Sequence, residues 1–117
     1  MALTLYGIPN CDQVKKARTW LDNHDHPYHF HDFKKAGITP ALIAGWLQHV
    51  SWEILVNRKG TTWRALPDER KAAIMDAKSA TALMVESPSI IKRPVLVSDS
   101  AIHVGFADDK YLQFFQK

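Results

Sequence analysis

Cysteine is the residue of which this chain has least, with Cys11 the single one among 117 residues. One cysteine cannot form an internal disulfide, which excludes the disulfide-stabilised scaffolds common among small secreted proteins. Any disulfide chemistry at Cys11 must therefore take its second sulfur from another molecule. A reducing compartment keeps such a thiol free, so we expect the protein to be cytoplasmic.

Long hydrophobic runs and a strong charge of one sign are also missing. No apolar run approaches the roughly 18 residues that span a bilayer, and residues 1–4 lack the basic and apolar regions of a signal peptide. The net charge is +3, and the basic residues form small groups that fit small anions better than a nucleic-acid backbone. We expect neither membrane insertion nor direct nucleic-acid binding.

The composition is that of an ordinary globular domain, with 46% hydrophobic and 23% charged residues. A chain of this length can bury one core but not two. The sequence therefore predicts a single domain over residues 1–117, and we expect a monomer.

The N-terminal third predicts a strand, a helix and a second strand. The short apolar run of residues 2–6 ends at Gly7. From Asp12 onward the apolar residues recur at helical spacing, which places Cys11 where an amphipathic helix begins. Alternating aromatic and polar residues at 28–33 complete a βαβ unit.

The middle of the chain predicts several helices. Thr39 is suited to cap a helix that has Pro40 at its first position, and a short helix is expected at 52–56. Residues 57–64 look like a loop, and a helix starting near Pro67 should continue to Ala77. A further helix should then run from a cap at Ser79 to about Glu86.

The C-terminal part predicts a β-hairpin and a last helix. Residues 94–97 and 102–104 are the two strands, with a turn at 99–100. Asp108 or Asp109 is suited to cap the helix that follows, and its residues Tyr111, Leu112 and Phe115 should pack on the sheet. The order β-α-β, helical insertion, β-β-α predicts an α/β fold of thioredoxin-like plan, in which helices cover both faces of a small mixed sheet.

Three motifs in this order resemble the ArsC/Spx family, and most closely its YffB-like branch. They are residues 6–12 (YGIPNCD), 57–64 (NRKGTTWR) and 91–97 (IKRPVLV). The resemblance spans nearly the whole chain. It implies a thioredoxin-like fold, a nucleophilic Cys11, and an Arg93–Pro94 pair in which the proline is cis.

The residues support a reactive Cys11 on their own account. A thiol at a helix N-terminus faces unpaired backbone N–H groups and the positive end of the helix dipole, and both favour the thiolate. Lys15, one turn further on, adds positive charge. The residues alone leave an alternative for each: Cys11 could be a buried structural thiol, and Arg93 could be a solvated residue at the edge of the sheet.

The resemblance also implies an arginine in the middle loop, which the local register assigns to either Asn57 or Arg58; we favour Arg58. It further implies that Arg93 binds the anionic substrate or glutathione beside Cys11. We therefore expect glutathione as co-substrate, held by Lys15, Arg58, Arg93 and Pro94, an unidentified thiol or oxyanion as substrate, and glutaredoxin as a further candidate partner.

Two departures from the family pattern narrow the function. Val14 stands where the Spx redox switch has its second cysteine, so a dithiol switch is excluded. Gly7 and Gly105 stand where we align a histidine and an arginine of the arsenate reductases. The sequence thus favours a glutathione-dependent thiol reductase, with an Spx-like regulator that binds RNA polymerase, or an arsenate reductase, as alternatives.

A local group of histidines raises the question of a metal site. The group consists of His24, His26, His29 and His31. No cysteine or carboxylate completes a recognised ligand spacing, so we expect surface histidines and no metal.

Overall fold

The computed structural model describes residues 3–116, which divide into two compact units. One unit combines the chain up to Ala36 with the segment from Arg93 onward, and the other is Gly37–Lys92. The expected single domain over residues 1–117 stays a prediction. No helix in the described range is long and apolar enough to cross a membrane.

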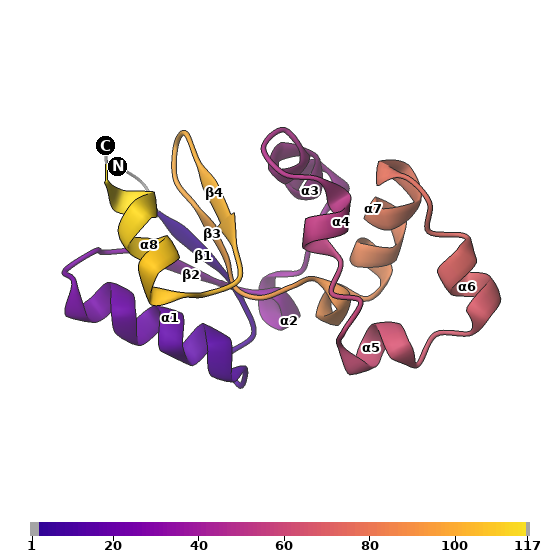
Figure 1. Ribbon diagram of the computed structural model, residues 1–117, viewed down its shortest axis with the longest axis horizontal. Helices are drawn as coiled ribbons and strands as arrows, with labels where there is room; N and C mark the ends of the chain where they lie inside the picture. The colour runs from indigo at the N-terminus through magenta and orange to yellow at the C-terminus, as the bar shows by residue number, and fades with distance from the viewer. Residues whose placement is uncertain (1–2, 117) are drawn as a thin grey trace. The chain divides into compact units, whose positions relative to one another are not determined.

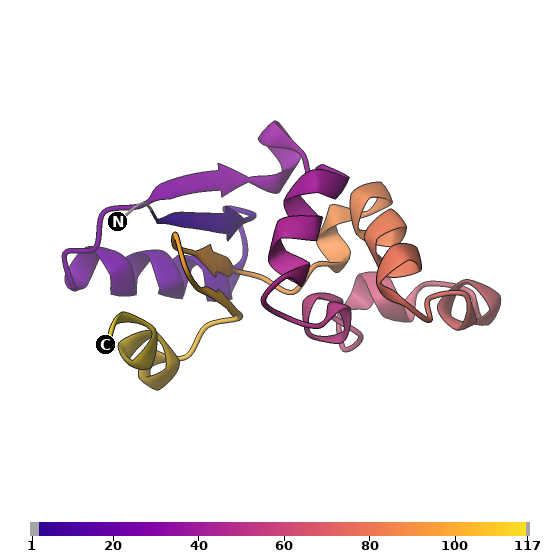
Figure 2. The same ribbon diagram turned by 90° about the horizontal axis from the view of Figure 1, so that it is seen from above.

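The first unit contains a four-stranded mixed sheet in the order β2-β1-β3-β4 (Figures 1 and 2). The strands are β1 (Thr4–Gly7), β2 (His29–Asp32), β3 (Val95–Val97) and β4 (Ile102–Val104). β1 is parallel to β2 and antiparallel to β3, and β3 is antiparallel to β4. This is the thioredoxin-like arrangement, as the element order predicts.

Helices α1 (Asp12–Asn23) and α8 (Asp108–Phe115) share one core with this sheet. Their apolar residues meet Leu5 and Leu96, which are paired across β1 and β3 and fully buried. The core consists of Leu3, Leu5, Ala17, Trp20, Leu21, Leu96 and Tyr111. At about 25 cal/mol per Å², burial of such residues is the main force holding α1 against β1, and hence Cys11 in place.

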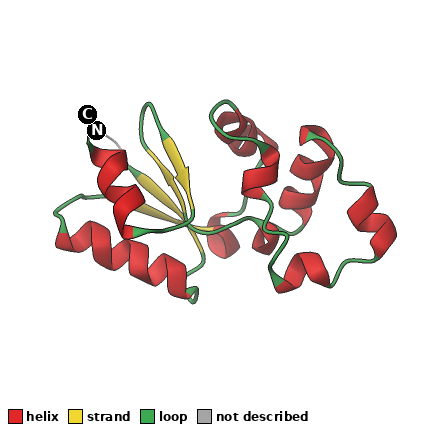
Figure 3. Cartoon of the chain, viewed as in Figure 1, coloured by secondary structure: helices red, strands yellow, loops and turns green. Residues whose placement is uncertain are grey.

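The second unit consists of helices and connecting loops (Figure 3). Its helices are α3 (Pro40–Leu47), α4 (Trp52–Leu55), α5 (Thr61–Arg64), α6 (Asp68–Ala72), α7 (Ala77–Glu86) and the 3-10 turn η1 (Pro88–Ile90). α7 packs against α3, α4 and η1 through Leu83 and Met84. The backbone of Val56, just after α4, forms an antiparallel bridge to Ile91 near the C-terminal end of the unit.

Several predicted boundaries are wrong. Residues 61–64 form α5 instead of a loop, and α6 ends at Ala72. Asp76, not Ser79, caps α7; Ser79 is the third helical residue, and the two side chains form a reciprocal capping box. A helix of a single turn is too short to show a hydrophobic period in the sequence.

The ends of two other elements also differ from expectation. The strand predicted at 28–33 stops at Asp32, and buried Phe33 begins α2 (Phe33–Ala36). The N-cap of α8 is Ala107, so Asp108 and Asp109 occupy its first turn, where their charges suit the helix dipole. In α8 Tyr111 is buried as expected, whereas Leu112 is 49% exposed.

Candidate active site

Cys11 is the N-cap residue of α1 and is partly exposed. Its extended backbone lets its carbonyl accept a hydrogen bond from the Lys15 N–H at 3.0 Å, while its own N–H donates to the Ile8 carbonyl at 3.2 Å. The neutral thiol makes no side-chain capping hydrogen bond. The first-turn N–H groups of Gln13 and Val14 are therefore available to a thiolate at this position.

The surroundings favour the charged form of Cys11. Partial burial by itself raises the pKa of the thiol, but the hydrogen bonds that the Val14 N–H, the Arg93 guanidinium and the Gln13 N–H can donate to a thiolate outweigh it. The positive charge of Arg93 adds to these, and the pKa of Cys11 is lowered from its ordinary value. A thiolate is the nucleophilic form of cysteine, so this geometry suits attack on an electrophile.

Arg93 reaches Cys11 because of how the strands pair. β3 lies beside β1 in antiparallel register, with Val95 opposite Tyr6. The residues just before β3 therefore lie beside the loop that follows β1, the loop that carries Cys11. The Arg93–Pro94 peptide bond is cis, as the resemblance implies, and the Pro94 carbonyl accepts a hydrogen bond from Gly105 at 2.8 Å.

Lys15 is placed differently from Arg93. It is exposed and lines a groove beside α1, together with Lys16 and residues near the start of α8. The charged side chain that lowers the pKa of Cys11 is Arg93. Sequence proximity alone would suggest Lys15 as the cation that lowers the pKa of Cys11, whereas Arg93 comes close to Cys11 through strand pairing.

Asn57 and Arg58, the two candidates for the anion-binding residue of the middle loop, have different surroundings in the structure. The Asn57 carbonyl side-chain oxygen accepts the Lys59 N–H at 3.2 Å, and its amide packs so close to Gly60 that a Cβ there would lie 2.9 Å away. Asn57 thus shapes the turn. Arg58 is exposed, pairs with Glu53 at 3.5 Å and lies over the Trp52 and Trp63 rings, which leaves it the better candidate to bind an anion.

Gly7 and Val14, two of the three positions at which the sequence departs from the family pattern, lie close together. A Cβ built on Gly7 would lie 2.7 Å from Cγ2 of Val14, which is fully buried. A side chain at position 7 therefore does not fit while valine occupies position 14.

The histidines take part in ring packing. The His24 ring stacks on Trp20 with centroids 3.8 Å apart, and His26 stacks on Phe115 at the same distance. Within residues 3–116 no group of three or more His, Cys, Asp or Glu side chains is arranged to hold a metal ion.

Comparison with known proteins adds the family. The ArsC family model matches residues 6–114. The chain belongs to the ArsC family. Within it, the chain is similar to the YffB-like branch: a solved structure named YFFB is 45% identical with a TM-score of 0.91, covering 96% of this chain and 97% of the other.

Two other ArsC-family comparisons bear on function. A solution structure of an arsenate reductase (ArsC) related protein from Brucella melitensis is 46% identical with a TM-score of 0.77, covering 100% of this chain and 97% of that one. The global transcriptional regulator Spx of Staphylococcus epidermidis is 25% identical over 98% of this chain and 88% of its own length. The family thus includes proteins named for reduction and for regulation.

Proposed function

We propose that this ArsC-family protein is a glutathione-dependent thiol reductase that acts through Cys11 in the cytoplasm. The observation that carries the proposal is the position of Cys11 at the N-terminus of α1 beside Arg93, where the guanidinium and two N–H groups of the helix favour the thiolate and lower the pKa of the thiol. Membership of a family that includes an arsenate reductase-related protein supports a reductive role.

The chemistry is a series of three disulfide exchanges. The Cys11 thiolate attacks one sulfur of an oxidised substrate, the bond between the two substrate sulfurs breaks, and the released thiolate takes a proton from water. A thiolate of glutathione then attacks the substrate sulfur of the mixed disulfide, which restores the Cys11 thiolate and leaves that substrate sulfur bonded to glutathione. A second glutathione thiolate attacks the glutathione sulfur of this disulfide and releases the second substrate thiol, so two glutathione molecules become one glutathione disulfide for each substrate disulfide reduced.

An external thiol is required because the chain holds no second cysteine. Glutathione suits this role, since it is the abundant thiol of the reducing cytoplasm and carries two carboxylates. Arg93, beside Cys11, can bind a carboxylate through two parallel hydrogen bonds.

Reaction with glutathione disulfide tests the proposal directly. Wild-type protein should gain one glutathionyl group at Cys11 by intact mass, lose it on addition of reduced glutathione, and catalyse reduction of a small disulfide such as hydroxyethyl disulfide. The Cys11→Ser variant is the matched control and should do none of these. The proposal would be contradicted if the Cys11 thiol of the wild-type protein had a pKa of about 8.5, the value of a free cysteine, and formed no adduct.

The similarity to Spx over most of the chain favours a regulatory protein as the second candidate function. Such a protein would bind RNA polymerase and need no turnover. Val14 in place of a second cysteine removes a dithiol switch but does not bear on binding. Recovery of purified RNA polymerase by the immobilised protein, equal for wild type and Cys11→Ser, would favour this alternative.

A further inference from the structure

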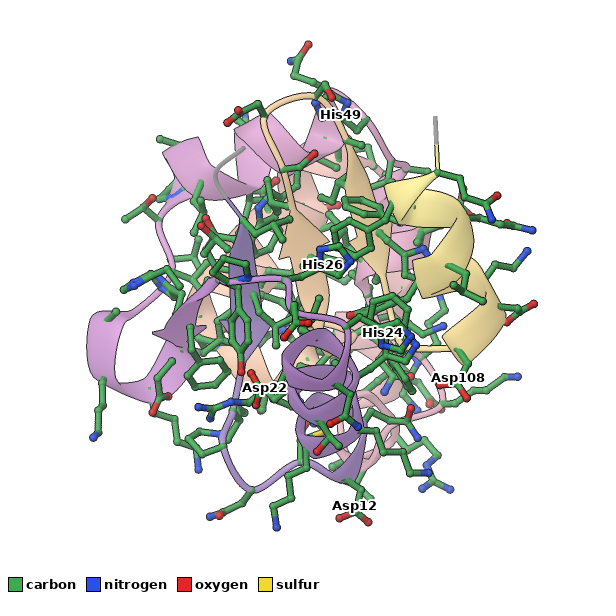
Figure 4. All side chains as sticks on the ribbon, turned by 90° about the vertical axis from the view of Figure 1, so that its left-hand side faces the viewer. Asp12, Asp22, His24, His26, His49 and Asp108 are labelled. Carbon is green, nitrogen blue, oxygen red and sulfur yellow. The ribbon has the colours of Figure 1, made fainter. Side chains whose placement is uncertain are left out.

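A groove runs along α1 where the helix faces the segment before α8, within the first unit. We call it the α1–α8 groove. It is lined from α1 by Gln13, Lys15, Lys16, Thr19, Trp20, Asn23 and the following His24, and from the other side by Phe106, Ala107 and Asp108. Figure 4 shows His24 between α1 and the first turn of α8, with Asp108 beside it.

The α1–α8 groove starts near the thiol-bearing end of α1. Its first lining residue is Gln13, two residues after Cys11, and the backbone N–H of Gln13 is one of the donors that favour the thiolate; Cys11 itself does not line the groove. The last lining residue within α1 is Asn23, so the groove follows the helix for about 15 Å at about 1.5 Å per residue. An extended peptide of about five residues covers that length, whereas glutathione, with three, is too short to fill it.

The groove also has the chemistry of a peptide site. Trp20 and Phe106 supply apolar aromatic surface, while Thr19 and Asn23 supply hydrogen-bonding groups. Lys15 and Lys16 are both exposed and lie within about one and a half turns of Cys11. These two lysines bring positive charge to the part of the groove nearest the thiol, where no acidic residue lines it. The acidic lining residue, Asp108, belongs to the opposite wall, and exposed Asp12 beside Cys11 does not line the groove.

We propose that the α1–α8 groove holds the peptide part of a glutathionylated protein substrate and selects acidic residues next to the oxidised cysteine. This proposal rests on the disulfide reduction proposed above. Cys11 attacks the glutathione sulfur, the peptide leaves along the groove as a thiolate that takes a proton from water, and a second glutathione releases the adduct as glutathione disulfide.

The test uses two synthetic six-residue peptides, each with one cysteine glutathionylated, followed by three glutamates or by three lysines. The full-length wild-type protein should reduce the acidic peptide with a kcat/KM at least about fivefold higher than that of the basic peptide, from contacts with two exposed lysines. Equal values for the two peptides would overturn the proposal and leave the reductase activity intact.

A charge reversal locates the preference. Lys16→Glu should lower the ratio of acidic to basic kcat/KM to about one or below, because it removes a positive charge from the groove and adds a negative one. Lys34→Glu makes the same change of charge at another exposed lysine, on α2, which does not line the groove. This variant should keep the wild-type ratio. If the ratio falls equally in both variants, the preference comes from the net charge of the protein, and the proposal that the groove selects acidic residues is overturned.

A binding measurement separates the groove from the chemistry. The acidic peptide, in its reduced form, is added to the 15N-labelled Cys11→Ser variant, and amide shifts are expected along α1 and at residues 106–108. If the wild-type protein reduces no disulfide, such shifts would leave the groove as a peptide site while the proposed reductase falls. Shifts confined to other parts of the chain, or none, would overturn the groove.

Discussion

Arg93 and Cys11 lie far apart in the sequence, yet the arginine contributes to the pKa of the thiol both as a hydrogen-bond donor and as a charge. Replacing Arg93 with alanine should therefore raise the pKa of Cys11 and slow its alkylation by iodoacetamide near neutral pH. Arg93→Lys should raise the pKa less, because it keeps the charge but loses the planar donor group. The measurement is the alkylation rate as a function of pH.

Arg18→Ala is the matched control for that experiment. Arg18 lies on the same helix as the thiol, but its Nε donates to the Tyr28 hydroxyl at 3.1 Å and its guanidinium lies over the Phe30 ring. Its loss should leave the pKa of Cys11 unchanged. A pKa that stays at the wild-type value in Arg93→Ala would show that the helix N–H groups alone activate the thiol.

The contact between Gly7 and Val14 predicts a coupled effect on stability. Gly7→Ala places a Cβ 2.7 Å from the Val14 side chain and should lower the free energy of unfolding by about 1–3 kcal/mol, as overpacking does. Val14→Ala removes the clashing methyl groups, so the double variant should be less destabilised than the sum of the two single variants. Urea unfolding measures all three; additive losses would be inconsistent with the contact.

At the scale of elements, the sequence predicted best where a helix was long enough to show its period. Val14, Ala17, Trp20 and Leu21 of α1 are buried on one side, and this helix begins where the pattern placed it. The four residues of α5 offer barely one turn, and nothing local distinguishes them from a loop. Short helices depend on tertiary packing, which a single sequence does not display.

The cap of α3 was predicted from Thr39 followed by Pro40, and the structure confirms it. The Thr39 hydroxyl oxygen accepts the Leu42 N–H at 3.2 Å. Thr39→Ala should therefore lower the free energy of unfolding by about 1 kcal/mol, whereas Thr39→Ser keeps the hydroxyl and should lose little. Thermal or urea unfolding decides this, and an equal loss in both variants would contradict a capping role.

At the scale of the whole molecule, the lowered pKa of Cys11 links folding to pH. Between its folded pKa and about 8.5, the ordinary value, the unfolded chain holds a proton that the folded chain has lost. The thiolate contribution to stability is therefore complete above the unfolded pKa and is lost as pH falls through the folded pKa. The free energy of unfolding should rise with pH across this window.

Cys11→Ser provides the reference for that prediction, because serine does not titrate there. The difference in free energy of unfolding between wild type and Cys11→Ser should grow as pH rises through the window and level off above it. Denaturant unfolding at a series of pH values gives this difference. A difference independent of pH would mean that folding leaves the pKa of Cys11 unchanged.

Sequence alone is enough to establish that Cys11 is the single cysteine, to predict that it starts an amphipathic helix, and to place any second sulfur on another molecule. These follow from composition and from the local period of α1. The tertiary structure supplied the physical reason that Arg93 lies beside Cys11, which is the pairing of β3 with β1; the sequence had indicated this only through a resemblance. It also showed that Asn57 shapes its own turn, that Gly7 and Val14 lie close together, and that a groove follows α1. The last two depend on contacts between segments, which local patterns do not encode.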